Sequence, residues 1–216
     1  MKRSLTISLL KKEAALFAAQ ESIHSEPILF GVTDGKAVGT YLEHKFQEHI
    51  LDKYTHIFGS SAKGIDLPGL NVDIKTTSIK QPQSSCPFKS ARQKIYGLGY
   101  HLLIFVYEKT DDHKRQTGRL NILHSIFVDQ TKTADFQTTS GLLSILKNEG
   151  NTDDIIGFLA EKMLPIDDIQ AQSLAEEILK RPPVIGYLTI SNALQWRLQY
   201  NRAIQSAGII DGIDKL

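Results

Sequence analysis

Three residues between positions 64 and 78 have the types and the spacing of a site for metal-assisted hydrolysis. Asp66 precedes Asp73 by seven residues, across a short turn that contains a Pro-Gly pair, and Lys75 follows Asp73 by two. Side chains alternate between the two faces of a strand, so Asp73 and Lys75 share one face of the strand that we expect here. The pattern predicts that two carboxylates and one ammonium group converge at the end of a hairpin-like unit.

This group of side chains suits the hydrolysis of a phosphodiester. Mg²⁺ prefers oxygen ligands and is usually bound through one or two carboxylates, with water and substrate phosphate in the remaining positions. Asp66 and Asp73 are therefore candidate metal ligands. Lys75 is a candidate to hold the attacking water or to neutralise negative charge that develops on the phosphate. The alternative is that Asp73 and Lys75 form an ordinary ion pair on one face of a strand.

A predicted helix over residues 36–51 offers a third carboxylate. Its apolar side chains recur at three- and four-residue spacing, as in a helix with one buried face. They are Val38, Tyr41, Leu42, Phe46 and Ile50. Glu43 lies at the border of this apolar stripe, and Gly39, one turn earlier, allows another segment to approach closely. Glu43 is a candidate secondary metal ligand or water-orienting group, and a solvated glutamate is the alternative.

At these positions the sequence resembles the PD-(D/E)XK nucleases. A glycine four residues before Glu43, followed by the Asp66, Asp73 and Lys75 pattern, is similar to the motif of that superfamily. The seven-residue step is similar to that of the MutH-like nicking enzymes and their restriction-enzyme relatives. The run Asp-Ile-Lys-Thr-Thr is also similar to the catalytic strand of some blunt-cutting type II restriction endonucleases. The likeness covers about residues 34–107. An aspartate stands where MutH-like enzymes have glutamate, and no proline precedes Asp66.

The resemblance implies a fold, an activity and partners. The implied fold is α/β, a restriction-endonuclease-like mixed central sheet flanked by helices, with the metal site at one edge. The implied function is that of a type II restriction endonuclease, which uses Mg²⁺ to hydrolyse double-stranded DNA at a specific sequence and leaves 5′-phosphate and 3′-hydroxyl ends. The resemblance also implies a homodimer on a short palindromic site and a cognate DNA methyltransferase in the same system. The implied catalytic residues are Asp66, Asp73, Lys75 and Glu43, and the implied metal ligands are Asp66, Asp73 and Glu43.

Two other functions are compatible with the same residues. One is a MutH-like nicking enzyme of DNA repair, which acts as a monomer and depends on partner proteins. The other is a non-catalytic DNA-binding protein in which the two aspartates and the lysine are structural. Restriction is favoured over repair because the chain offers a loop and a terminal helix for base contacts and shows no identifiable region for docking a partner.

The stretch that follows the catalytic motif has the charge pattern of a DNA-contacting surface. From Ile74 to Tyr107 the sequence contains no Asp or Glu, so positive charge is concentrated beside the acids that would hold metal. Lys and Arg can contact phosphates, and hydroxyl and amide groups can add hydrogen bonds to phosphates or base edges. The candidates here are Lys80, Gln81, Gln83, Ser84, Ser85, Lys89 and Arg92. The alternative is a neutral-to-basic loop without a partner.

The elements that must position these residues follow from the apolar pattern. Residues 88–97 are predicted to form a helix that ends at a glycine, and residues 101–107 form a continuous apolar run, as expected for a strand buried on both faces. A helix between two strands makes a crossover, so the catalytic strand and the 101–107 strand are expected to be parallel neighbours. Residues 120–128 are the next predicted strand. An N-terminal helix beginning after Ser8 serves either in the core or in dimerisation.

The last third of the chain is predicted to be helical. Helices are expected around residues 140–146, 153–163 and 169–180, and a capped helix over residues 189–204. This last helix, which carries Arg197 and Arg202, either enters a groove of DNA or lies on the surface with a polar face. The sequence thus divides into a catalytic domain, residues 1–150, and a helical C-terminal region, residues 151–216, packed on the same domain and contributing to DNA binding.

Length and composition set wider bounds. The chain has 216 residues with 41% hydrophobic and 23% charged content and a formal net charge of +1, as in an ordinary globular protein. A single cysteine excludes an internal disulfide framework and favours a reducing, cytoplasmic setting. No apolar run approaches membrane-spanning length, so we expect no membrane insertion.

Overall fold

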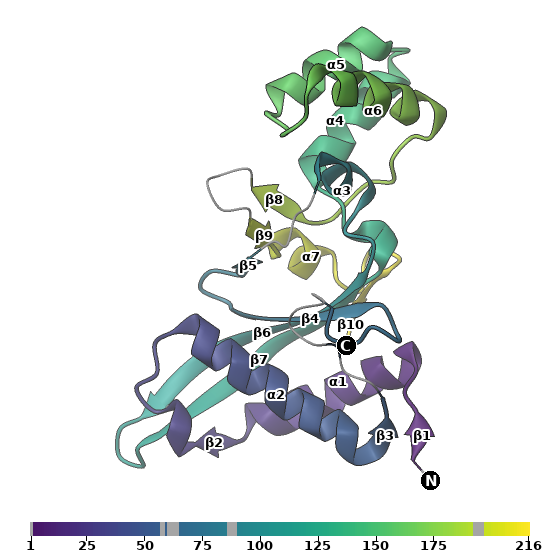
Figure 1. Ribbon diagram of the computed structural model, residues 1–216. Helices are drawn as coiled ribbons and strands as arrows, with labels where there is room; N and C mark the ends of the chain where they lie inside the picture. Colours follow the sequence, from purple (N-terminus) through teal and green to yellow (C-terminus); the bar gives the residue numbers. More distant parts are fainter. Residues whose placement is uncertain (1, 57–58, 60–64, 86–89, 192–196) are drawn as a thin grey trace. The chain divides into compact units, whose positions relative to one another are not determined.

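The computed structural model of the protein describes residues 2–56, 59, 65–85, 90–191 and 197–216. The chain divides into two compact units (Figure 1), which are described separately. Unit 1 contains residues 1–84, 101–128 and 207–216, and unit 2 contains residues 85–100 and 129–206. Residue 150, where the sequence predicts a domain boundary, lies inside unit 2.

A mixed sheet is the centre of unit 1. Its main strands are β4 (Val72–Ser78), β6 (His101–Asp112), β7 (Thr117–Val128) and β10 (Ile213–Lys215). Their order is β10-β7-β6-β4, and the short β2 (Ser25–Glu26) also pairs with β7. β4 and β6 are parallel, with Asp73 opposite Leu102, whereas β6 and β7 form an antiparallel hairpin. The parallel pairing predicted from the crossover is confirmed, and β4 stands at one end of the strand order.

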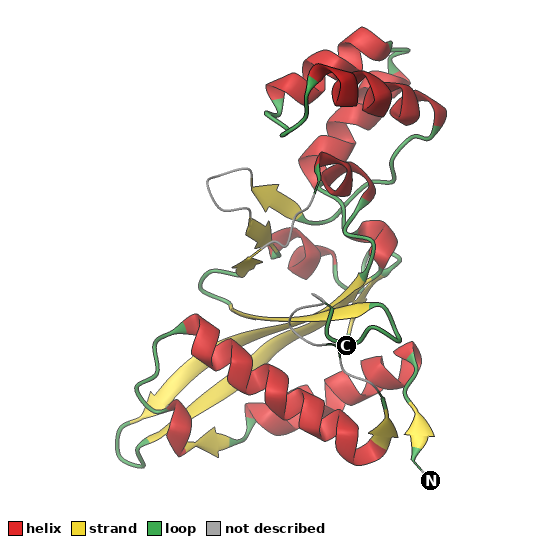
Figure 2. Ribbon diagram, in the orientation of Figure 1, coloured by secondary structure: helices red, strands yellow, loops and turns green. Residues whose placement is uncertain are grey.

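Two helices cover one face of this sheet. They are α1 (Ile7–Ser22) and α2 (Gly35–Lys53), and Figure 2 shows both on the same side of the strands. Phe17 of α1, Phe46 of α2 and Phe105 of β6 meet in the core, with ring centroids 5.1 to 5.7 Å apart. Burying side chains of this size contributes roughly 1.5–3 kcal/mol each. The N-terminal helix is therefore a core helix. Its N-cap is Thr6 rather than the predicted Ser8.

The α2 helix begins as the sequence predicts. The Asp34 side chain accepts hydrogen bonds from the main-chain amides of Lys36 and Ala37, which satisfies two of the otherwise unpaired N–H groups of the first turn. The buried face of α2 contains Val38 and the apolar residues one, two and three turns later. Two short strands, β1 (Arg3–Ser4) and β3 (Tyr54–Thr55), pair in parallel beside this helix pair, and a 3₁₀ turn, η1 (Pro27–Leu29), precedes α2.

Unit 2 is mainly helical. Its helices are α3 (Ala91–Tyr96), η3 (Gln130–Lys132), α4 (Phe136–Lys147), α5 (Thr152–Glu161), α6 (Asp168–Lys180) and α7 (Asn201–Ser206). Asn151 and Asp167 form capping boxes at the starts of α5 and α6, which explains why these two helices begin where the sequence predicts. Ile95, Leu142 and Ile155 belong to the shared core of these helices. The strand β5 (Gln83–Ser85) lies where the chain passes between the units.

The helix predicted over residues 189–204 is wrong. The structure has strand β8 (Thr189–Ser191) and strand β9 (Arg197–Gln199), which pair antiparallel, followed by the short α7; residues 192–196 lie outside the described part of the chain. The physical reason is the alternation of burial, since Ile190 and Leu198 are buried between half-buried neighbours. The buried Asp135 also accepts a hydrogen bond from the amide of Ile190, which fixes this segment in an extended conformation.

These elements agree with the predicted α/β, restriction-endonuclease-like class of fold, a mixed sheet with flanking helices. No helix in the described residues is long and apolar enough to cross a membrane.

Candidate active site

Strand β4 places Asp73 and Lys75 side by side. Lys75 Nζ lies 2.8 Å from Asp73 Oδ2, so the two side chains share one face of the strand as expected. Asp73 is only 3% exposed, whereas Lys75 is half-buried. The ion pair therefore lies below the surface, where solvent screens it less than an exposed pair.

A tight turn brings Asp66 back to the same strand. Leu67 and Val72 exchange both main-chain hydrogen bonds, which closes the turn between them. Asn71 takes the left-handed conformation, with φ of 55°, that asparagine tolerates better than most residues. The Asp66 carboxylate then accepts a hydrogen bond of 2.7 Å from the amide of Ile74. Asp66 also raises the pKa of the Asp73 carboxyl, so the seven-residue step brings the two carboxyl groups close enough to interact.

The third carboxylate reaches this group from α2. Glu43 is half-buried and hydrogen-bonded to the hydroxyl of Thr76 on β4. The helix approaches the strand closely at Gly39, where a Cβ atom would lie 2.7 Å from Thr76 Oγ1. The close approach that the sequence suggested at Gly39 is thus an approach to Thr76, and it positions Glu43 at the site.

Two acids of this cluster, Asp73 and Glu43, have raised pKa values. Burial raises the pKa of Asp73 to about 7; Lys75 opposes the rise, and the neighbouring Asp66 adds to it. Burial also raises the pKa of Glu43 to about 7, and Asp66 adds to the rise while Lys75 and Thr76 oppose it. Such an accumulation of buried carboxylates is costly unless a cation compensates their charge.

Lys75 remains charged in this setting. Burial alone would lower the pKa of its ammonium group, but the carboxylate of Asp73, with smaller contributions from Asp66 and Glu43, raises that pKa above its ordinary value. A charged lysine beside two carboxylates can neutralise a phosphate oxygen or donate a hydrogen bond to a water molecule.

The donor set fits a hard divalent cation. Asp66 and Asp73 supply carboxylate oxygens, and such a cation usually takes one or two carboxylates from the protein. The contact between Lys75 and Asp73 Oδ2 lacks the angles of a hydrogen bond, so this buried oxygen retains lone pairs for a metal ion. In the part of the chain that the structure describes, no group of three or more His, Cys, Asp and Glu side chains is placed to hold a metal by itself.

The β4–β5 segment (residues 79–84) carries the nearest candidate DNA contacts. Lys80 and Gln81 are exposed, and Gln83 and Ser84 are half-buried. All four belong to unit 1, as do the candidate catalytic residues. Ser85 follows in β5 and is exposed. In sequence, these residues follow the C-terminal end of the strand that carries the acids.

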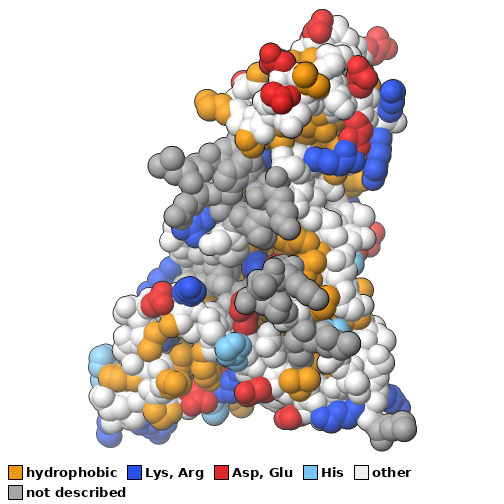
Figure 3. Space-filling view, in the orientation of Figure 1, with side chains coloured by type: hydrophobic (Ala, Val, Ile, Leu, Met, Phe, Trp, Pro, Cys, Tyr) orange, Lys and Arg blue, Asp and Glu red, His pale blue; other side chains and the backbone are white. Residues whose placement is uncertain are grey.

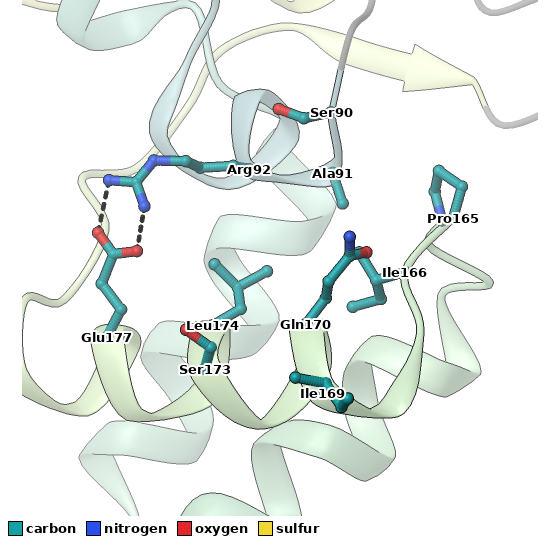
Figure 4. Close-up of a pocket in the computed structure, with 10 residues that line it drawn as sticks. All are labelled: Ser90, Ala91, Arg92, Pro165, Ile166, Ile169, Gln170, Ser173, Leu174 and Glu177. Atoms are coloured by element: carbon teal, nitrogen blue, oxygen red, sulfur yellow. Dashed lines mark hydrogen bonds and ion pairs between the residues drawn. The ribbon is translucent and has the colours of Figure 1, made fainter.

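The arginines proposed as DNA contacts already have partners within the protein. Arg92 of α3 forms a bidentate ion pair with Glu177 of α6, in which its Nη2 lies 2.6 Å from Glu177 Oε1. Figure 4 shows this pair beside a cavity of about 470 Å³ between α3 and α6, which is lined entirely by residues of unit 2. The guanidinium of Arg202 stacks 3.5 Å from the ring centre of Phe136. Arg197 begins β9 and is half-buried, and Lys89 lies outside the described residues.

The surface of α5 and α6 has a different character. Acidic side chains gather over these two helices in Figure 3, and both helices begin with acidic residues in or just before their first turn. Such a surface repels a phosphate backbone. It does not resemble a DNA-contacting face.

Two functional candidates were missed by the sequence analysis. Thr76 and Thr77 follow Lys75 directly and appeared only as members of a strand. The structure shows that Thr76 bonds to Glu43 and that Thr77 bonds to the backbone of the β4–β5 segment. Two successive hydroxyl side chains after Lys75, one on each face of the strand, were the signal that was available.

Comparison with known proteins gives an independent line of evidence. Residues 4–215 match the model of a protein family described as Type II restriction enzyme NspV. A curated relative, the type II restriction enzyme NspV of Nostoc sp. (strain ATCC 29411 / PCC 7524), is 62% identical over 209 residues, which are 97% of this chain and 95% of the relative. No solved structure matches the chain.

Proposed function

Because the chain belongs to the NspV family of type II restriction enzymes, we propose that Asp66, Asp73 and Lys75 are the catalytic centre of this enzyme and that Glu43 assists them. The chain is a site-specific deoxyribonuclease, and its family implies a divalent metal cofactor. Mg²⁺ is the proposed ion, because the candidate ligands are carboxylates.

One observation carries the assignment of these residues. Lys75 Nζ lies 2.8 Å from Asp73 Oδ2, and Asp66, held by the amide of Ile74 on the same strand, is close enough to raise the pKa of Asp73. Residues seven positions apart are brought together by a turn whose main-chain hydrogen bonds, together with the bond from Ile74 to Asp66, hold the geometry. A buried group of like charges is costly to maintain and is characteristic of functional sites.

Each side chain has a distinct task in the proposed reaction. Asp66 and Asp73 hold the ion, which when bound polarises the phosphate and promotes deprotonation of water. Lys75 orients the attacking water and neutralises charge that accumulates on the phosphate oxygens. Glu43, held by Thr76, serves as a secondary ligand or orients water. Water adds to phosphorus and the bond from phosphorus to the 3′ oxygen breaks. The leaving oxygen takes a proton, which leaves a 5′-phosphate and a 3′-hydroxyl.

The proposed DNA contacts are concentrated in the β4–β5 segment. Its exposed or half-buried side chains supply one positive charge at Lys80 and the amides of Gln81 and Gln83, which suit phosphate and base edges respectively. Arg92 and Arg202 have partners within the protein and would need to release them to contact DNA. We place the reaction in the cytoplasm, on a palindromic site bound by a homodimer, with a cognate methyltransferase protecting the host DNA.

The test is plasmid cleavage with variants that keep side-chain size. Asp73→Asn and Lys75→Met are expected to lower the cleavage rate in Mg²⁺ by at least about a hundredfold, because each removes a charge that acts on the reacting phosphate. Lys109 and Asp111 on β6 provide a matched control, since they form an ion pair between residues two apart on a strand, as Asp73 and Lys75 do. Lys109→Met and Asp111→Asn are expected to cut at the wild-type rate.

The products separate the competing functions. Restriction predicts discrete double-strand fragments that require a divalent metal and disappear in EDTA. Single nicks at defined sites would indicate a MutH-like activity instead. Full cleavage by Asp73→Asn or Lys75→Met would refute the assignment of these residues, while leaving membership of the family untouched.

A further inference from the structure

The hydroxyl of Thr77 has an unusual number of partners for a buried strand residue. Thr77 is 4% exposed and lies at the end of the catalytic strand, two residues after Lys75. Its Oγ1 lies 3.2 Å from the carbonyl oxygen of Gln81 and 3.1 Å from that of Gln83, and it accepts a hydrogen bond of 3.0 Å from the amide of Gln83. The Thr77 hydroxyl thus accepts a hydrogen bond from the segment and donates its single proton to one of the two carbonyl oxygens, so that it contacts three main-chain groups.

Further hydrogen bonds join the main chain of the segment to β4 and β6. The amide of Ile79 donates to the carbonyl of Tyr107 on β6, and the amides of Lys80 and Gln81 donate to the hydroxyl and carbonyl oxygens of Ser78. Because its polar backbone groups are satisfied near β4, the segment has a defined conformation rather than that of an open loop. The side chains of Lys80 and Gln81 remain exposed on it.

We infer that Thr77 is a positioning residue for sequence specificity, which fixes the DNA-contacting side chains of residues 80–83 relative to Asp73 and Lys75. This inference rests on the proposed function of the β4–β5 segment. Thr77 forms a rigid link between the candidate catalytic residues and the β4–β5 segment. It lies on the strand face that carries Asp73 and Lys75, and it binds the backbone that presents Lys80, Gln81 and Gln83.

With a rigid link of this kind, the contacts between the segment and the bases determine which phosphate lies at Asp73 and Lys75. An error of about 1 Å in the position of a reacting group can lower a rate roughly a hundredfold. If the segment were free to move, its side chains could bind DNA without placing the scissile phosphate at Asp73 and Lys75. The link therefore affects the difference in cleavage rate between correct and incorrect sites more than it affects the affinity for DNA.

Thr76 provides a contrast within the same strand. Its hydroxyl bonds to Glu43 on α2 and not to the β4–β5 segment in any hydrogen bond that the described residues show. Loss of the Thr76 hydroxyl should therefore change the chemical step at all sites alike. Loss of the Thr77 hydroxyl should change the discrimination between sites.

The experiment compares cleavage rates at correct and altered sites. The site is first mapped by sequencing the ends that the wild-type enzyme produces in plasmid DNA. Short duplexes are then made with that site and with single base-pair changes, and kcat/KM is measured in Mg²⁺ for wild type, Thr77→Val, Thr77→Ser and Thr76→Val. Valine keeps the branched shape but removes the hydroxyl, and serine keeps the hydroxyl.

The expected result is a loss of discrimination in one variant. Thr77→Val lowers the ratio of kcat/KM between correct and altered sites roughly tenfold, the order expected from weakening one base contact. Thr77→Ser retains the wild-type ratio, and Thr76→Val lowers kcat at every site while keeping the ratio. If Thr77→Val slows all sites by the same factor, the hydroxyl has only a structural role and the inference is overturned.

A second measurement keeps the inference testable if Thr77→Val does not fold. Hydrogen exchange of the Gln83 amide in the wild-type enzyme is expected to slow when a duplex with the correct site is added in EDTA, and to change little with a duplex of unrelated sequence. Equal protection by both duplexes would overturn the inference. Failure of the proposed function itself is recognised separately, by full cleavage with Asp73→Asn.

Discussion

Replacement of Gly39 by alanine tests how α2 positions Glu43. Alanine in a helix interior is favoured over glycine by about 1 kcal/mol, so this substitution would stabilise an unobstructed helix. Here the added Cβ would lie 2.7 Å from Thr76 Oγ1, far inside normal contact distance, whereas Thr76 Cβ is 4.0 Å away. Only the Thr76 hydroxyl would clash with the added Cβ atom. The substitution must therefore rotate the Thr76 side chain and break its bond to Glu43.

The free energies can be estimated from these contacts. Forcing Thr76 away from its favoured rotamer costs about 0.5–1.5 kcal/mol, and losing its hydrogen bond costs about 1 kcal/mol. Together these exceed the gain from alanine, so Gly39→Ala should change the free energy of unfolding by about −0.5 to −1.5 kcal/mol. In a Thr76→Ala background the obstruction is absent, and the same substitution should stabilise by about 1 kcal/mol. The coupling between the two sites is then about 1.5–2.5 kcal/mol.

The assay is a double-mutant cycle followed by urea unfolding and by single-turnover cleavage. Gly39→Ala is expected to cut about tenfold more slowly than wild type, because Glu43 loses the hydroxyl that holds it; tenfold corresponds to about 1.4 kcal/mol. If Gly39→Ala stabilises the protein by about 1 kcal/mol in both backgrounds and cuts at the wild-type rate, then neither the close approach nor the role of Glu43 is correct.

Three further predictions follow from the described contacts. Burial alone would raise the pKa of Glu13, but hydrogen bonds from Lys53 and two neighbours lower that pKa from 4.5 to about 2. The ionised Glu13 carboxylate therefore stabilises the folded protein fully above pH 4.5, and this stabilisation is lost as the pH falls through about 2. Glu13→Gln should lower the free energy of unfolding, measured in urea, by about 2 kcal/mol at pH 7 and hardly at all near pH 2; an equal loss at both pH values would contradict this. Mg²⁺ should raise the melting temperature of the wild type but not that of the Asp66→Asn, Asp73→Asn double variant, because only the former binds the ion when folded; calorimetry with and without EDTA measures this. Lys80→Met should reduce the slope of log K against log salt concentration for duplex binding by about 0.9, as expected for one lost phosphate contact, and an unchanged slope would remove Lys80 from the interface.

Strand β4 and its neighbours were predictable because the local sequence pattern and the tertiary packing favour the same structure there. The alternation around Asp73 predicted both the strand and the shared face with Lys75, and the continuous apolar run after His101 predicted a buried parallel neighbour; the pairing of β4 with β6 confirms both. The helices predicted at residues 36–51, 153–163 and 169–180 are also present, and each begins at a cap that acts within a few residues. Signals of this kind do not depend on distant parts of the chain.

The segment from residue 189 was misjudged because its conformation depends on a distant residue. Ile190 donates its amide to Asp135, which is 55 residues away in sequence, and no local pattern reveals that partner. In the structure Leu188 and Ile190, and Leu198 and Tyr200, are buried at a spacing of two, whereas the apolar spacings of this segment in the sequence also fit a helix. The partners of Arg92 and Arg202 were hidden for the same reason, since Glu177 and Phe136 come from other helices.

The contacts of Thr77 have a consequence for protein engineering. They involve only main-chain atoms of Gln81 and Gln83, so the shape of that stretch does not depend on which side chains it displays. Libraries randomised at positions 80, 81 and 83 should therefore fold at high frequency while offering new chemical groups to the bases. Under the proposed function, the recognised DNA sequence can then be changed without redesigning the strand that carries Asp73 and Lys75.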